Sequence, residues 1–138
     1  MDLRQLREEI VEIFSIGVLS LSGLLLLSIG ALRLSNPIGN YSKNSGIKIE
    51  NEVNLLNEVR GTGSLMFFGG ATILSGIIVP QLAFASFVVA TVIFFGFAFG
   101  RLLSIRLDGR PNKLIIRGLI SEIVLGSLNI VGLFMNLA

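Results

Sequence analysis

The stretch FGFAFGRLLSIRLDGRP, residues 95–111, separates two long apolar runs and decides the fold. The run that ends at Gly100 is uncharged, three arginines and one aspartate follow, and apolar residues resume after Pro111. Asp108-Gly109 and Pro111 are typical of a helix end followed at once by a helix start. The stretch therefore predicts a charged hairpin between two membrane-spanning helices.

The composition predicts a membrane protein with a single domain over residues 1–138. Apolar residues make up 52% of the 138 residues and charged residues 14%, against about 25% charged in soluble domains. Four blocks are nearly free of charge, and about 20 apolar residues cross a bilayer core of roughly 30 Å. We therefore expect an all-α polytopic membrane protein with four transmembrane helices. The expected spans are about 13–32, 61–79, 82–104 and 113–137, with a polar loop at 33–60.

Turn signals arrange the four spans as two antiparallel hairpins. Pro80-Gln81 allows only a tight turn between the second and third spans, so both termini lie on the face of that turn. Before the first span, Leu3, Leu6 and Ile10 recur at helical spacing among charged residues. We expect a short N-terminal interfacial helix there, leading into the first span.

The basic residues predict how the bundle is oriented. Nine of the eleven Lys and Arg lie on the face with the loops, and only Arg4 and Arg7 lie on the face with the termini. By the positive-inside rule, loops 33–60 and 105–112 are expected in the cytoplasm and both termini outside. The nine are Arg33, Lys43, Lys48, Arg60, Arg101, Arg106, Arg110, Lys113 and Arg117.

The missing residue types restrict the chemistry. The sequence has no cysteine and no histidine, which removes thiolate nucleophiles, Ser-His pairs and the usual zinc and haem ligands. The net charge of +2 is small, and the basic residues lie beside apolar spans, which does not favour nucleic-acid binding. We therefore expect a non-catalytic protein in the lipid bilayer, without catalytic residues, metal, cofactor or nucleic-acid partner.

Glu122 lies inside the fourth apolar span and is the most informative single residue. A carboxylate in a span costs roughly a few kcal/mol, so it usually faces the bundle interior and pairs with another group. Gly118, Gly126 and Asn129 fall on the same helical face at steps of three or four residues. This polar stripe of small and polar residues is predicted to be the packed face of the helix.

Depth and side-chain direction choose a partner for Glu122. At 1.5 Å per residue, Arg101 lies roughly 30 Å and Glu122 roughly 22 Å above the far face, a gap that two long side chains can bridge. Helical side chains lean toward their own N-terminus, so Arg101 leans into the membrane and Glu122 leans toward it. We expect these two residues in contact, with Glu58, Arg60 and Asp108 in a second ring of a buried charge cluster.

Four roles stay open for this charge cluster. The plainest is structural, with paired charges that fix the helix register. The others are binding of an anionic ligand or lipid headgroup, a proton or ion pathway, and acid–base catalysis. The GxxxG pattern of Gly96 and Gly100 suits internal packing and dimerisation equally.

Five motifs follow one another in a fixed order: NEVRG (57–61), GG (69–70), FGRLLS (99–104), LDGRP (107–111) and EIVLG (122–126). Together they resemble a known family, the bacterial four-span membrane family catalogued as domain of unknown function 4345. The resemblance covers about residues 10–137 and implies four spans in the bacterial inner (plasma) membrane. It also implies that the predicted charge cluster belongs to one motif set, but it implies no activity, substrate or cofactor.

Two functions suit such a bundle. The first is an accessory or scaffold subunit that packs against partner membrane proteins or against copies of itself. The alternative is a binder or carrier of a small anionic amphiphile or lipid beneath the Arg101 hairpin. A bundle filled with side chains favours the first function, and an apolar cavity under Arg101 favours the second.

Overall fold

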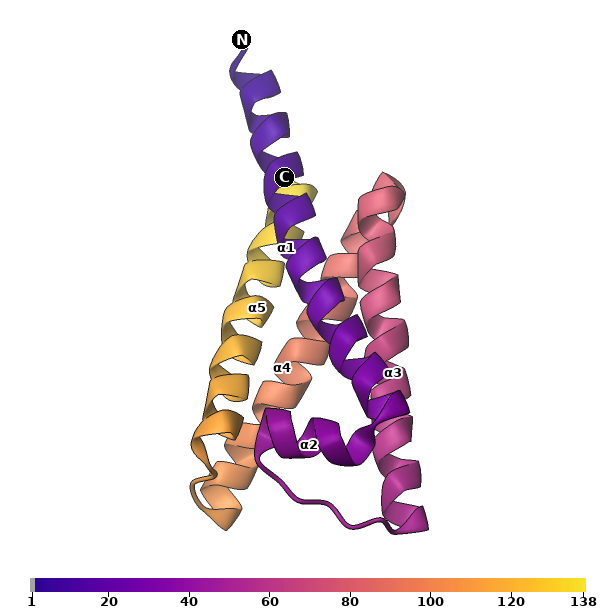
Figure 1. Ribbon diagram of the computed structural model, residues 1–138. Coiled ribbons are helices and arrows are strands. Elements are labelled where there is room, and N and C mark those ends of the chain that lie inside the picture. Colours follow the sequence, from indigo (N-terminus) through magenta and orange to yellow (C-terminus); the bar gives the residue numbers. More distant parts are fainter. Residues whose placement is uncertain (1) are drawn as a thin grey trace.

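The computed structural model describes residues 2–138, and all regular structure in that range is helical (Figure 1). Four of the helices are long and apolar enough to cross a membrane. The predicted all-α membrane fold and the number of spans are therefore confirmed. The elements are α1 (Leu3–Ser35), α2 (Pro37–Ser45), α3 (Val53–Ile78), the short 3₁₀ helix η1 (Pro80–Leu82), α4 (Ala83–Asp108) and α5 (Lys113–Leu137).

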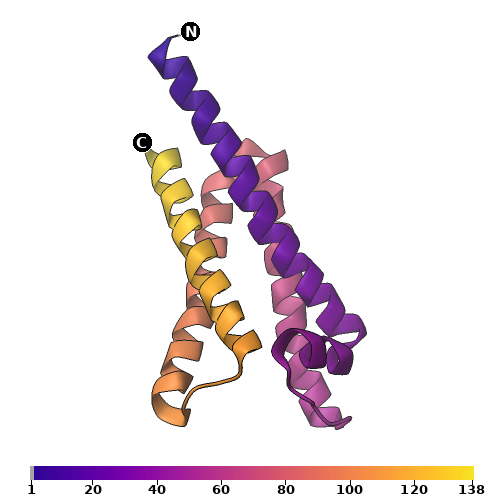
Figure 2. The same ribbon diagram turned by 60° about the vertical axis from the view of Figure 1, so that its left-hand side comes forward.

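The four long helices form two antiparallel hairpins, α1 with α3 and α4 with α5 (Figure 1). The N- and C-terminal ends and η1 lie at one end of the molecule, called here the terminal end. Helix α2 and the α4–α5 turn lie at the opposite end, called here the loop end. Figure 2 shows that α1 and α5 diverge toward the loop end, so the two hairpins are not packed evenly along their length.

Facing glycines hold α1 against α3. A Cβ added to Gly70 would lie 2.7 Å from the carbonyl oxygen of Gly23, and a Cβ added to Gly30 would lie 2.7 Å from that of Gly63. Real side chains do not tolerate such distances, so these positions must lack a Cβ. The two helices therefore approach backbone to backbone, which is how membrane helices commonly pack where no hydrophobic effect drives their association.

The small residues of α5 receive aromatic rings from α4. The ring of Phe95 lies 3.0 Å from where a Cβ of Gly126 would be, and the ring of Phe87 covers Gly132. Gly126, Asn129 and Gly132 are all buried. The polar stripe thus lies on the packed face of α5, as its small residues predict.

Helix α1 is longer than the predicted span because the expected interfacial helix is its direct continuation. Its 33 residues give a length of about 50 Å, well beyond a hydrocarbon core of roughly 30 Å. Residues 3–12 prolong the axis of the first span instead of turning across it (Figure 2). The sequence has no proline or glycine before Gly17, and these are the usual causes of a kink.

The polar loop predicted at 33–60 contains a helix, α2. Asn36 and Pro37 suggest a turn, but Asn36 caps α2 by accepting a hydrogen bond from Gly39 N over 3.0 Å. Pro37 occupies the start of the helix, where its missing N–H is not needed. Gly46 ends α2 in the left-handed conformation, with a φ of 63°. The same residue types that signal a turn therefore begin and end a helix here.

Candidate functional site

The predicted contact between Arg101 and Glu122 is present at the loop end of the bundle. The Nε of Arg101 donates a hydrogen bond to Oε1 of Glu122 over 2.9 Å, which also makes the two residues an ion pair. Helix α4 rises toward the loop end and α5 descends from it, so the two side chains lean toward each other. The side-chain direction used in the sequence prediction therefore gives the observed pair.

Arg33 joins this pair and was missed by the sequence prediction, which counted it only among the basic residues of the loop face. It lies near the end of α1, and its side chain is on the buried face of that helix with only 8% exposed. Its Cζ lies 4.8 Å from the ring centroid of Tyr41 in α2, a cation–π contact. Since α1 also rises toward the loop end, the rule that places Arg101 would have placed Arg33.

Arg33 has no anionic partner among residues 2–138. Neither of the two ion pairs in that range involves Arg33. Its Nε is buried and makes no hydrogen bond, and the same holds for Oε2 of Glu122. Buried polar groups are nearly always satisfied, so each exception calls for an explanation.

An apolar cavity of about 150 Å³ lies beneath Arg101. Arg33, Arg101 and Glu122 all line it, so both unsatisfied polar atoms belong to residues of its wall. All four long helices and α2 contribute to the lining. Its apolar wall includes Leu26, Ile29, Met66, Phe94, Phe97 and Ile115.

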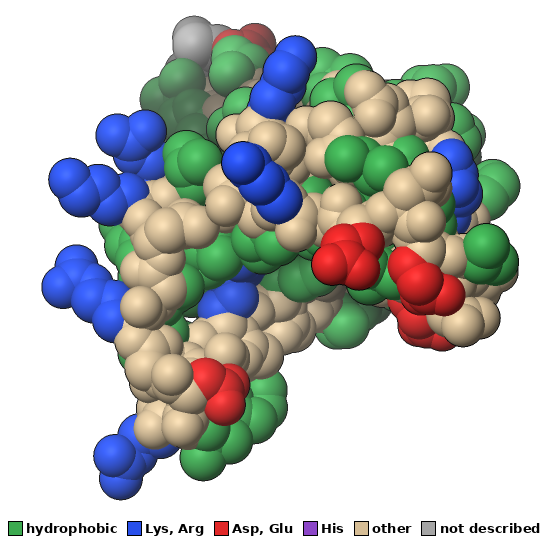
Figure 3. Space-filling model, turned by 60° about the horizontal axis from the view of Figure 1, so that its bottom comes forward, with side chains coloured by type: hydrophobic (Ala, Val, Ile, Leu, Met, Phe, Trp, Pro, Cys, Tyr) green, Lys and Arg blue, Asp and Glu red, His purple; other side chains and the backbone are tan. Residues whose placement is uncertain are grey.

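Helix α2 lies between this cavity and the outside of the loop end. Asn112, which caps α5, also donates a hydrogen bond from Nδ2 to the carbonyl oxygen of Ser45 at the end of α2, over 2.8 Å. This bond ties α2 to the α4–α5 turn. Figure 3 looks onto the loop end and shows a hollowed surface with basic side chains gathered along it.

The predicted second ring of charges is wrong. Glu58, Arg60 and Asp108 are all exposed, and none of them lines the cavity. Arg60 donates a hydrogen bond from Nε to the carbonyl oxygen of Leu34, and Asp108 accepts one from Ser104. Arg60 stands near the start of a helix that descends from the loop end, so its side chain leans outward toward water.

The polar stripe of α5 makes two side-chain bonds to α1. Asn129 donates from Nδ2 to Oγ of Ser22 over 2.8 Å in the buried centre of the bundle. One heptad farther along, Asn136 donates to Oγ of Ser15 over 3.0 Å. Gly118 lies at the opposite end of the stripe and is half-buried. A Cβ added to Gly118 would lie 3.7 Å from the guanidinium of Arg101.

The arrangement at the loop end has the chemistry of an anion site. Two guanidinium groups and one carboxylate leave one net positive charge beside an apolar cavity. Arg33 offers a hydrogen-bond donor, and Glu122 offers an acceptor through its free oxygen. For a metal ion, no group of three or more Asp, Glu, His or Cys side chains comes together within residues 2–138.

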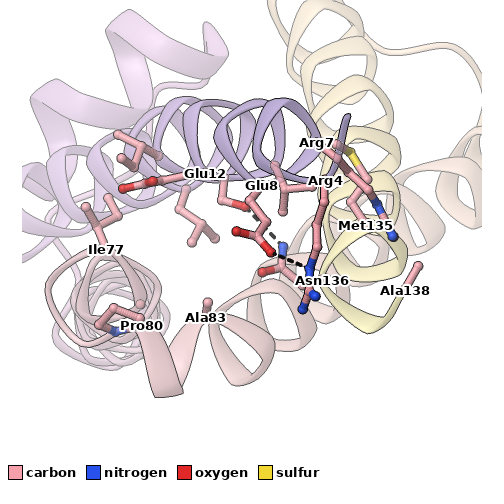
Figure 4. Close-up of a pocket in the computed structure, with 15 residues that line it drawn as sticks. Arg4, Arg7, Glu8, Glu12, Ile77, Pro80, Ala83, Met135, Asn136 and Ala138 are labelled. Atoms are coloured by element: carbon pink, nitrogen blue, oxygen red, sulfur yellow. Dashed lines mark hydrogen bonds and ion pairs between the residues drawn. The ribbon is translucent and has the colours of Figure 1, made fainter. Parts of the chain in front are cut away.

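A second depression lies at the terminal end, where α1, α5 and the η1 turn border an open groove of about 660 Å³ (Figure 4). Its basic residues, Arg4 and Arg7, are matched by the acidic Glu8 and Glu12. Arg4 and Glu8 form an exposed ion pair of 3.3 Å. This groove is lined by balanced charges, in contrast to the unbalanced charge of the cavity at the loop end.

Residues 15–133 match a sequence family described as domain of unknown function (DUF4345). The chain belongs to this family. The match includes all of α3 and α4, most of α1 and α5, and the residues Arg33, Arg101 and Glu122. No curated protein and no solved structure matches the chain significantly. The family description assigns no activity to this DUF4345 protein, so its role has to be argued from the geometry of its cavity.

Proposed function

We propose that this DUF4345 protein is a non-catalytic binder of a small anionic amphiphile, with the acidic head in the loop-end cavity and the tail in the bilayer. The observation that carries the proposal is Arg33, a buried arginine without an anionic partner in the wall of an apolar cavity. An arginine keeps its positive charge in proteins. Burial of an unpaired charge costs several kcal/mol, which an anionic ligand would offset.

The size of the cavity supports a head-in, tail-out arrangement. A cavity of about 150 Å³ is comparable with an engineered one that holds a single benzene molecule. A headgroup fits in such a volume, but a long hydrocarbon chain does not. The tail of the ligand would therefore leave the cavity sideways.

The surface around the cavity offers a path for that tail. Leu25 of α1 and Leu114 and Ser121 of α5 line the cavity, yet all three are exposed at the surface of the bundle. Helices α1 and α5 themselves diverge toward the loop end (Figure 2). In a membrane these exposed residues face lipid, so an amphiphile can reach the cavity without passing through water.

The unsatisfied atoms favour a particular headgroup chemistry. The Nε of Arg33 requires an acceptor, and Oε2 of Glu122 requires a donor. A single negative charge neutralises the site. A singly charged acidic head that also carries a hydroxyl or an acidic proton, such as a phosphate monoester in its monoanionic form, satisfies both atoms.

Calorimetric titration of the full-length protein in a neutral detergent tests the proposal. The probes are decanoate, decyl phosphate and the uncharged decanol. At least one of the two anions is expected to bind, and decanol is not. Replacement of a buried charge partner costs about 2–5 kcal/mol, so Arg33→Gln should weaken anion binding at least about tenfold.

Arg106→Gln is the matched control, because Arg106 lies in the last turn of α4 and is exposed. It should leave binding unchanged. A preference for decyl phosphate over decanoate would identify a phosphate head, and the reverse a carboxylate. Equal binding of decanol and the anions, or anion binding that Arg33→Gln does not weaken, would overturn the proposal.

We further propose that the loop end faces the cytoplasm of a bacterial inner membrane, since nine of the eleven basic residues lie at that end. The chain has no cysteine, so single cysteines report their side without background labelling. Lys48→Cys is suitable because Lys48 is exposed, whereas Ser45 is buried. A membrane-impermeant reagent should label it only after the membrane is opened. Labelling in intact cells would reverse the orientation.

The accessory or scaffold function is the second candidate, supported by the outer face of α4. Gly96 and Gly100 are exposed, and an added Cβ at either would have nothing within 4 Å. This GxxxG pattern therefore does not serve packing inside the described chain. If it holds a partner helix, Gly96→Ile should remove membrane proteins that co-purify with the wild-type protein in mild detergent, and Gly61→Ile should not.

A further inference from the structure

The first eleven residues of α1, Leu3 to Ile13, extend beyond the rest of the bundle. The hydrogen bond between Asn136 of α5 and Ser15 of α1 places these two residues at the same height along the bundle, and α5 ends at Leu137. The segment before Phe14 therefore passes the end of α5 and extends roughly 16 Å farther. We call residues 3–13 the N-terminal extension; Figures 1 and 2 show it projecting past the C-terminus.

The N-terminal extension carries an uncovered apolar stripe. Leu3 is 82% exposed, Leu6 40%, Ile10 52% and Ile13 71%. Their spacing alternates between three and four residues, so they share one face of the helix. Large apolar side chains that extend into water beyond the end of a bundle are unfavourable. A partner that covers this stripe stabilises the helix.

We propose that the partner is the N-terminal extension of a second copy, which packs in parallel as a short coiled coil. The stripe occupies the a and d positions of a heptad repeat, with Leu3 and Ile10 at a and Leu6 and Ile13 at d. Two copies in one membrane share the same orientation, so their extensions run parallel. Identical stripes then meet in register about a two-fold axis along the membrane normal.

The charges beside the stripe complement each other in a parallel pair. Arg7 occupies the e position, and Asp2 occupies the g position of the preceding heptad, on the opposite flank of the stripe. In a parallel dimer the e residues of one helix lie beside the g residues of the other. Each flank of the dimer therefore brings Arg7 of one copy near Asp2 of its partner.

A second surface extends this contact area. An open apolar groove of about 530 Å³ lies beside the stripe, lined by Leu3, Leu6 and Ile10 of α1 and by Val131 and Phe134 of α5. Side chains of a neighbouring extension can enter it. The opposite flank of α1 is polar: in Figure 4, Arg4, Glu8 and Glu12 border the other groove, toward the η1 turn and Asn136.

Cysteine cross-linking in native membranes tests this interface, because the chain has no cysteine of its own. Leu6→Cys and Ile10→Cys should each give a disulfide-linked dimer on oxidation with copper phenanthroline. Glu8→Cys and Glu12→Cys are the matched controls on the polar flank and should cross-link at least about fivefold less. Self-cross-linking at one position also identifies a parallel pair, since an antiparallel pair would instead join position 3 to position 13.

A charge swap provides a second readout that does not depend on how well any one cysteine reacts. In the Leu6→Cys background, Arg7→Glu should reduce the dimer severalfold, and adding Asp2→Arg should restore it. The proposal is overturned if positions 6 and 10 give no dimer, if positions 8 and 12 cross-link equally well, or if the swap does not restore the dimer. None of these results bears on the anion site, which lies at the opposite end of the bundle.

Discussion

Helix α1 contacts α3 and α5 in opposite ways. Against α3 it presents Gly23 and Gly30, and the two backbones meet directly. Against α5 it presents Ser15 and Ser22, which receive hydrogen bonds from the asparagines of the polar stripe. We call the backbone contacts of α1 with α3 at Gly23 and Gly30 the glycine seam. We call the hydrogen bonds of α1 with α5 at Ser15 and Ser22 the polar seam.

The difference between the seams explains where the cavity forms. The glycine seam cannot open without loss of close contacts over the whole interface. The polar seam consists of bonds one heptad apart, at Ser15–Asn136 and Ser22–Asn129. The next heptad step brings Glu122, which bonds to Arg101 instead of to α1. The polar seam therefore ends before Glu122, and the apolar cavity occupies the space beyond its end.

The largest loss of stability is expected from a substitution in the glycine seam. Gly70→Leu places a side chain where even a Cβ would lie 2.7 Å from the carbonyl oxygen of Gly23. Overpacking of this kind costs about 1–3 kcal/mol and sometimes more, so we expect the high end of that range. Gly61→Leu, on the same helix but with nothing near an added Cβ, is the control. Thermal unfolding in detergent by circular dichroism measures both; equal stabilities would remove the distinction between the seams.

A smaller loss of stability is expected from a substitution in the polar seam. Ser22→Ala removes the acceptor of the Asn129 bond but leaves Asn129 bonded to the carbonyl oxygen of Leu125. Side-chain bonds between membrane helices average about 0.6 kcal/mol, so the loss should be near that value. Ser127→Ala is the control, because Ser127 is exposed and bonds only to its own helix. A loss as large as that of Gly70→Leu would show that the polar seam is the stronger of the two.

The smallest effect is expected at the start of α3. Glu52 accepts hydrogen bonds from Asn54 N and Leu55 N, and these bonds lower the pKa of its carboxyl. Its stabilising contribution is therefore complete above the ordinary carboxyl pKa of about 4.3 and is lost as the pH falls through the lower folded-state pKa. Glu52→Gln should remove this acid dependence. Hydrogen exchange in the first turn of α3 measures it, and protection of the glycine seam should stay unchanged.

The direction in which helical side chains lean predicted the Arg101–Glu122 pair from the sequence. The prediction missed Arg33, because the rule was not applied to it. Arg101 and Glu122 follow from depth along two helices and from the lean of helical side chains. The same rule points Arg33 into the bundle, but Arg33 stands where the apolar run ends and was counted as a loop charge. Glu58 and Asp108 were placed in a second ring around the pair without a side-chain direction of their own, and both are exposed.

The sequence by itself determined the four spans, their antiparallel order and the packed face of α5, because these depend on apolar length, turn residues and helical period within single segments. The tertiary structure alone decided that Arg33 lacks an anionic partner, that α2 covers the loop end and that α1 and α5 diverge there. These features depend on how far apart the hairpins stand. That distance is set by glycines and aromatic rings that meet only across helices, so the sequence of a single segment does not predict it.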